Sequence, residues 1–241
     1  MSDSEQSSQL EAARIDRAVA VAKGVIGALP ILGPMFAEII GSVIPQQRLD
    51  RIADVLKRLE ERLGEIEQQR LQSSLATDSE AVDLLEEGMV QATRAVSDER
   101  RDQIAVLLHT TLTDEQLRHA EKRKLWSLLG SLSDVEVLIL QSHGVRHGED
   151  KATFWEKHEK SVYGPAVHMG SSQEELDRGA IYDGYRQHLR ELGLLRPNFR
   201  RPRRGELPEF DEKTGMMKTS GHKLTQLGRL LLRFLGLHAD P

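Results

Sequence analysis

Residues 24–45, GVIGALPILGPMFAEIIGSVIP, constrain the fold more than any other stretch, because their side chains are too apolar to stay in water. No charge occurs between Gly24 and Ala37, and Pro30 and Pro34 interrupt the run. Proline removes a backbone donor and clashes with the preceding helical turn. We therefore expect two short apolar helices joined by a tight bend, and we name residues 24–45 the apolar hairpin.

The apolar hairpin is too interrupted to predict a membrane-spanning helix, which needs about 20 apolar residues. It can fill the core of a soluble bundle, or enter a membrane when that bundle opens. Lys23 and Glu38 bracket it, and burying either charge in lipid costs at least a few kcal/mol. We expect a soluble resting state with conditional contact to a membrane or a partner. The contacting side chains would be Val25, Ile26, Leu29, Ile31, Leu32, Phe36, Ile39, Ile40, Val43 and Ile44.

Composition narrows the class of protein. A chain of 241 residues can bury a sizeable core, and a net charge of -5 with mixed signs does not indicate a nucleic-acid polyelectrolyte. The absence of cysteine excludes disulfides, thiol nucleophiles and cysteine-ligated zinc. The polar N-terminus lacks the basic start of a secretory signal. We predict a cytoplasmic protein, conditionally peripheral to the inner membrane, with residues 1–8 disordered.

The clearest periodicity follows the apolar hairpin. Apolar residues recur there at steps of three and four, with charges between them: Leu49, Ile52, Leu56, Leu59, Leu63 and Ile66. This seam is typical of coiled coils but spans fewer than three heptads. Packing within a bundle is therefore favoured over a standalone dimer.

Further helical signals continue to residue 141. Ser79 and Ser97 are candidate N-caps, while Thr113 with Gln116 and Ser133 with Glu136 match capping boxes. The predicted buried faces are Val82, Leu85, Met89, Ala92 and Val96, then Ile104, Leu107, Leu108 and Leu112. Residues 9–141 are therefore predicted to form an all-helical bundle.

The composition changes at Ser142. Residues 142–170 are rich in Gly, His and aromatic residues, which predicts a linker with one helix near 151–160. A helix should then begin at Ser171 or Ser172 and stop at Gly193. Its predicted buried face is Leu176, Ala180 or Ile181, Tyr185, Leu189 and Leu192. Two short strands around an Arg-rich tip and a helix over 224–237 complete a winged-helix-like α+β domain, residues 171–241.

The Arg-rich tip is a candidate anion or nucleic-acid site. Its arginines are Arg196, Arg200, Arg201, Arg203 and Arg204. The forked donors of arginine suit phosphate, so contact with a nucleic-acid backbone or an anionic lipid surface is one interpretation. A solvated loop is the other, because Glu206, Glu209, Asp211 and Glu212 follow closely.

No motif predicts catalysis, a cofactor or a metal. His143 and His147 are spaced like ligands on one helical face, with His158 and His168 nearby, but Gly144 and Gly148 disfavour a helix there. No Walker A, G-x-S-x-G or H-E-x-x-H pattern occurs. Trp126 and Trp155 are expected to be packing anchors. We expect a non-enzyme with no catalytic, cofactor-binding or metal-binding residues.

Five segments together resemble a known group. They are LGPMFAEIIGSVIP, RLDRIADVLKRLEERL, SDERRDQIAVLLHTTLTDEQ, LWSLLGSLSDVEVLIL and KLTQLGRLLLRFLGL. This pattern resembles the bacterial Abi-alpha group of abortive-infection proteins and related uncharacterised helical proteins. The resemblance implies a role in phage defence and carries over no catalytic residue.

Two hypotheses follow from the sequence. The first is a non-enzymatic defence or toxin-like effector that exposes its apolar hairpin to a membrane or partner when triggered. The second is a winged-helix DNA-binding regulator whose N-terminal bundle mediates dimerisation. A protein-protein adaptor is the remaining alternative, with self-association through helical faces.

Overall fold

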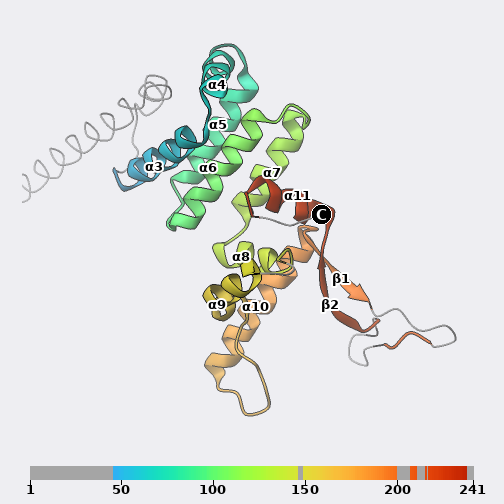
Figure 1. Ribbon diagram of the computed structural model, residues 1–241. Helices are drawn as coiled ribbons and strands as arrows, with labels where there is room; N and C mark the ends of the chain where they lie inside the picture. The colour runs from blue at the N-terminus through green and yellow to red at the C-terminus, as the bar shows by residue number, and fades with distance from the viewer. Residues whose placement is uncertain (1–45, 146–148, 200–206, 211–214, 216, 238–241) are drawn as a thin grey trace, which may run out of the picture. The chain divides into compact units, whose positions relative to one another are not determined.

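A computed structural model describes residues 46–145, 149–199, 207–210, 215 and 217–237 (Figure 1). The apolar hairpin lies outside these residues, as do the predicted tail at 1–8, His147 and four arginines of the Arg-rich tip: Arg200, Arg201, Arg203 and Arg204. The described chain is mainly helical and has one small antiparallel sheet, which confirms the coarse fold class. Its elements are α3 (Gln46–Arg62), α4 (Glu65–Thr77), α5 (Ser79–Ala92), α6 (Asp98–Thr113), α7 (His119–Ser131), α8 (Asp134–Ser142), α9 (Glu149–Val162), α10 (Gln173–Glu191), β1 (Leu195–Phe199), β2 (Thr219–Leu224) and α11 (Gln226–Phe234).

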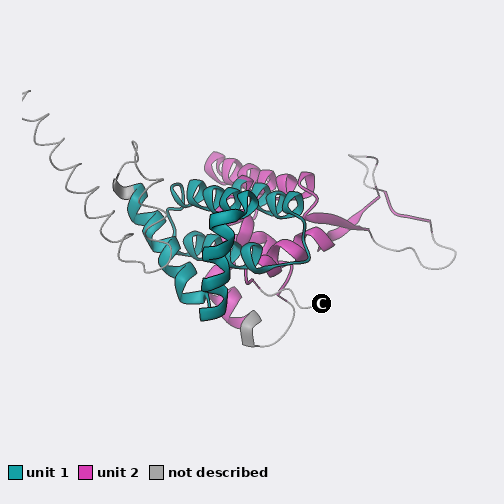
Figure 2. Ribbon diagram, turned by 90° about the horizontal axis from the view of Figure 1, so that it is seen from above, with its two compact units in different colours: residues 1–130 teal, residues 131–241 magenta. Residues whose placement is uncertain are grey.

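The described residues divide into two compact units, unit 1 up to Gly130 and unit 2 from Ser131 onward (Figure 2). The sequence instead suggested boundaries at 142 and 171. In the structure, α8 packs against α9, α10 and α11 within unit 2. The helix expected near 151–160 is present as α9, and it is part of this unit's packing.

Unit 1 is organised around the seam of α3. Leu49, Leu56 and Leu59 are at most 1% exposed, and α3 packs against α5 and α6. The apolar seam of α3 therefore packs against two other described helices of unit 1. Trp126 is also fully buried, as expected of a packing anchor.

The seam ends earlier than its periodicity suggests. The prediction that Ile66 continues it is wrong, because Ile66 is 69% exposed. Helix α3 ends at Arg62, and α4 starts at Glu65 with the Glu67 carboxylate accepting a hydrogen bond from the Gly64 N–H at 2.9 Å. Because α4 begins a new helix, its residues do not continue the periodicity of the buried face of α3. Val96 is exposed for a related reason, since α5 already ends at Ala92.

Three of the predicted caps are confirmed and two are wrong. Ser97, Ser133 and Ser172 each accept a hydrogen bond from a backbone N–H in the first turn of α6, α8 and α10. At α5 the cap is Asp78, not Ser79. Thr113 is the last residue of α6, and Asp114 accepts the hydrogen bonds from Gln116 and Leu117. In both failures an adjacent aspartate accepts the hydrogen bonds.

Ion pairs align α3 with α6 along the rim of their apolar contact. Their donor-acceptor distances are 2.6 Å for Arg101 Nε to Asp54 Oδ2, 2.9 Å for Arg58 Nη2 to Asp98 Oδ1 and 2.6 Å for Arg62 Nη2 to Asp102 Oδ1. Most of these groups are partly solvated, so the ion pairs add little to stability. They help fix the alignment of two helices that apolar burial already holds together.

Unit 2 joins α8, α9 and α10 to the β1–β2 hairpin and α11. Gly193, at φ 72°, ends α10 in the left-handed conformation that glycine tolerates, as predicted. The strands pair antiparallel, with Leu195 opposite Leu224. The last helix begins at Gln226, capped by Thr225, rather than at Leu224, which belongs to β2. Gly228 lets α11 approach the chain, because a Cβ there would lie 2.5 Å from the Leu194 carbonyl oxygen.

The predicted buried face of α10 is only partly covered. Leu189 is buried and Tyr185 and Leu192 are half-buried, but Leu176, Ala180 and Ile181 are exposed. The first half of this prediction is therefore wrong. The N-terminal half of the helix contacts the chain around the end of α9 with its other side, where Tyr182 donates a hydrogen bond to the Ser161 carbonyl oxygen at 3.2 Å.

The α3 seam generates a stability prediction. Leu56→Ala should lower the free energy of unfolding of unit 1 by about 2–5 kcal/mol, since it leaves a cavity in a fully buried site. Ile66→Ala, at the next position of the same sequence pattern, should change it by less than about 0.5 kcal/mol. Urea denaturation followed by Trp126 fluorescence in a Trp155→Phe background measures both. Equal losses would mean that α3 and α4 share one continuous seam.

Candidate functional site

The part of the predicted Arg-rich site that the structure describes lies on the β-hairpin. Arg196 on β1 is directly opposite Lys223 on β2, and both side chains are exposed. Like charges in directly opposed positions destabilise a strand pair. Leu195 and Leu224 are buried on the other face of the hairpin. The exposed face therefore presents two cations to solvent at the base of the segment that carries the remaining arginines.

A second charged cluster, which the sequence analysis missed, lies on the opposite face of the same hairpin. His222 is two residues from Leu224, so it shares that residue's face. Its ring lies edge-on, at 77°, to that of His143, the C-cap residue of α8, with a centroid separation of 6.5 Å. Arg186 and Arg190, one turn apart on α10, act electrostatically on these rings. We name His143, Arg186, Arg190 and His222 the His-Arg cluster.

The His-Arg cluster lowers the basicity of its own histidines. Burial lowers the pKa of His143 from its ordinary value of 6.5, and the neighbouring His222 and Arg186 lower that pKa further. Burial also lowers the pKa of His222, with added repulsion from Arg190 and Arg186. Both imidazoles are therefore held in an electropositive, partly desolvated environment that favours their neutral form.

The carboxylates around this cluster are engaged with other groups. Glu136 is buried, accepts hydrogen bonds from Ser133 and lies 2.6 Å from Nδ1 of His188. Arg186 Nη1 lies 3.4 Å from Asp183 Oδ1, but the aspartate side chain is 83% exposed. The carboxylate that pairs with Arg186 is therefore largely solvated and compensates its charge only weakly.

The remaining histidines do not form a metal site in the described residues. His158 lies 5.1 Å from the Phe154 ring, between centroids, and His168 occupies an exposed turn. Across the described ranges, no group of three or more His, Asp or Glu side chains could hold a metal ion. His109 and His119 each pair with one carboxylate, Glu67 and Asp83, which links helices of unit 1.

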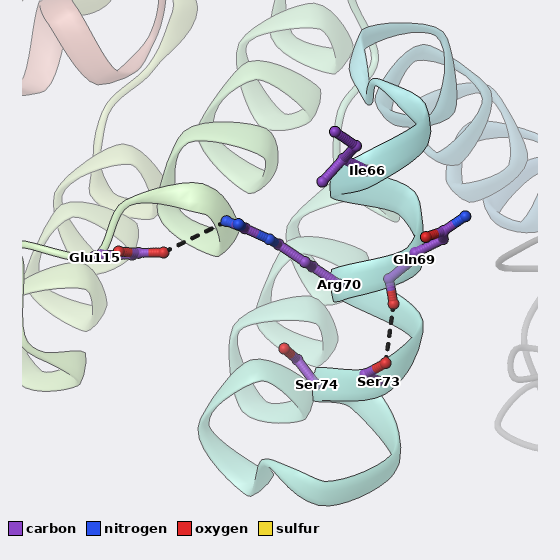
Figure 3. A pocket seen from close by; sticks show the side chains of 6 residues that line it. All are labelled: Ile66, Gln69, Arg70, Ser73, Ser74 and Glu115. Atoms are coloured by element: carbon purple, nitrogen blue, oxygen red, sulfur yellow. Dashed lines mark hydrogen bonds and ion pairs between the residues drawn. The ribbon is translucent and has the colours of Figure 1, made fainter.

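Unit 1 also has an open surface groove of about 520 Å³ beside α4 (Figure 3). It is lined by Ile66, Gln69, Arg70, Ser73, Ser74 and Glu115. Figure 3 shows Arg70 extending toward Glu115, and their Nη1 and Oε1 atoms are 3.6 Å apart. Both side chains are largely exposed, at 73% and 86%, so this ion pair lies at the surface of the groove.

Comparisons with known proteins find no match: no family model, no curated protein and no solved structure is similar to this chain. Within the described residues, no helix is both long enough and apolar enough to cross a bilayer.

The histidine environments predict how stability varies with pH. The pKa values of His143 and His222 in the folded state lie below 6.5. At a pH between these folded-state values and 6.5, the unfolded chain therefore binds more protons than the folded chain does. The free energy of unfolding of unit 2 should therefore fall as pH drops through this window. His143→Gln should reduce that fall, measured by thermal denaturation between about pH 7.5 and about pH 5.5.

His168→Gln, in the exposed turn of the same unit, is the matched control and should keep the full dependence. Hydrogen bonds from the Gly64 amide and the Arg101 side chain lower the pKa values of Glu67 and Asp98. The stability that these two carboxylates contribute is therefore lost only at lower pH. If the free energy of unfolding of His143→Gln varied with pH as steeply as that of the unmodified protein, the prediction would be contradicted.

Proposed function

We propose that this chain is a non-enzymatic bacterial effector of the phage-defence type, in which unit 1 carries the apolar hairpin and unit 2 senses or docks. The proposal joins the resemblance to the Abi-alpha group with the packing of unit 1. In it the apolar hairpin is shielded at rest, and a trigger exposes it to the inner membrane.

The single observation that carries this proposal is the complete burial of the α3 seam by described helices. Leu49, Leu56 and Leu59 already face α5 and α6, so this seam needs no cover from residues 24–45. An apolar segment joined to a helix whose seam is already covered can move without opening that seam. This arrangement favours conditional exposure over a permanent role of the hairpin in covering α3.

Unit 2 suits the sensing or docking role through its order of elements. Three helices, a two-stranded antiparallel hairpin and a closing helix follow one another, as α8, α9, α10, β1, β2 and α11. This order supports a winged-helix-like domain with α10 in the position of a recognition helix. The exposed N-terminal half of α10 would then be free to meet a partner.

Membrane entry can be tested with the full chain on dye-loaded vesicles of phosphatidylethanolamine and phosphatidylglycerol. The unmodified protein should release dye, and Gly27→Lys should release several-fold less, because a charge in lipid costs at least a few kcal/mol. Val96→Lys adds the same charge at an exposed site of unit 1 and should release dye like the unmodified protein. Absence of leakage by the unmodified protein, or equal leakage by Gly27→Lys, would overturn membrane entry.

A second candidate function, nucleic-acid binding by unit 2, is favoured by one specific observation. Arg196 and Lys223 oppose each other on the exposed face of the β-hairpin, where mutual repulsion opposes strand pairing. A phosphate backbone lying along this face would relieve that repulsion. In this second proposal the chain is a DNA-binding regulator, and the Arg-rich tip extends the contact with the phosphate backbone.

Nucleic-acid binding predicts a defined salt dependence. Each phosphate contact contributes about 0.9 to the slope of log affinity against log salt for duplex DNA. Arg196→Ala with Lys223→Ala should therefore reduce the slope by up to about 1.8, measured by fluorescence anisotropy of a labelled duplex. Lys57→Ala with Arg70→Ala removes two exposed cations from unit 1 and should leave the slope unchanged. Equal slopes for both double variants would exclude a specific role for the β-hairpin.

A further inference from the structure

The His-Arg cluster gathers four basic side chains from three elements of unit 2. His143 comes from the end of α8, Arg186 and Arg190 from α10 and His222 from β2. They are far apart in sequence, and none was predicted to act with another. Neither the membrane proposal nor the exposed Arg196–Lys223 pair uses them, because His222 lies on the other face of the hairpin.

The chemistry of the cluster selects an anion over a cation. Two imidazoles near each other could begin a metal site, but two guanidinium groups repel a cation and no third ligand joins them among the described residues. The partial negative charge at the C-terminus of α8 is roughly half a unit, which two full positive charges outweigh. The cluster therefore has a net attraction for negative charge.

The geometry also favours a ligand with several acceptor oxygens. Arg186 keeps only 32% of its side chain exposed, yet its ion pair with Asp183 is long at 3.4 Å. Arg190 donates to Gln187 and leaves other guanidinium donors on its fork. Two forked donors one turn apart on α10, both acting electrostatically on His222, suit a tetrahedral oxyanion better than a planar carboxylate, which one arginine can satisfy.

The desolvation of the histidines supports the same ligand class. Without a ligand, burial and charge repulsion favour the neutral form of both imidazoles. A dianion placed among the four groups would reverse that repulsion, so both rings could take up protons and donate hydrogen bonds to it. Binding of the ligand and protonation of the histidines would then be coupled.

We propose that His143, Arg186, Arg190 and His222 form a binding site for a phosphate group. The site is independent of membrane entry and of the Arg196–Lys223 face, so it can exist whether or not either activity does. The phosphate can belong to a small molecule or to a nucleic-acid backbone, and the recognition chemistry is shared.

The test is a histidine-ring NMR titration of the full chain in inorganic phosphate, with chloride at equal ionic strength as the reference. Phosphate should raise the pKa values of His143 and His222 together and saturably, and should leave the ring signals of His168 as they are in chloride. A second arm replaces phosphate with a short DNA duplex. A shift with inorganic phosphate assigns a small-molecule source, and a shift with the duplex alone assigns the backbone.

Arg186→Gln with Arg190→Gln should weaken phosphate binding at least about tenfold, because two charge-assisted donors are lost. It should also raise the resting pKa values of both histidines, since two repelling charges are gone, which loss of folding would not do selectively. Arg178→Gln, an exposed arginine on the same helix that pairs with Glu174, is the matched control and should bind like the unmodified protein.

Two results would overturn the proposal. One is the absence of any shift in His143 and His222 with both phosphate and duplex in the unmodified protein. The other is an equal shift in chloride, which would show general screening. Both results come from the unmodified chain, so the proposal stays testable even if the double variant does not fold.

Discussion

Burial of the apolar face of α3 against α5 and α6 is the interaction on which the rest of unit 1 depends. Leu56 and Leu59 are completely buried there, and each such side chain contributes about 1.5–3 kcal/mol. The partly solvated ion pairs along the same helices contribute much less. The apolar contact therefore holds α3 in place, and the charges refine its alignment.

In unit 2 the corresponding constraint is the buried carboxylate of Glu136. It closes the capping box of α8 with Ser133 and contacts His188 on α10. Removing one partner of a buried hydrogen bond leaves an unsatisfied polar group, which is costly. Glu136 therefore ties the start of α8 to a defined rotation of α10. That rotation sets where Arg186 and Arg190 point, so a structural contact positions the proposed phosphate site.

Local signals in the sequence predicted helix starts and ends well where one residue could act as the cap. Ser97, Ser133, Ser172 and Gly193 lie where their hydrogen-bonding and backbone preferences place them. The predictions failed at Ser79 and at Thr113, where an adjacent aspartate accepts the hydrogen bonds instead. Periodicity failed at Ile66 and at the N-terminal half of α10. Spacing describes one face of a helix but does not state where the helix stops or whether anything covers that face.

The candidate sites also differ in how much of each the sequence could predict. The charge of Arg196 is visible in the sequence, but its position opposite Lys223 depends on strand register. The His-Arg cluster could not be predicted, because its members come from three elements and no spacing connects them. The sequence by itself determined the helical class, three of the capped helix starts and the two strand segments, since these follow from interactions between near neighbours. Only the tertiary structure decided which faces are buried and which distant charges meet, because burial and long-range electrostatics depend on how separate elements pack.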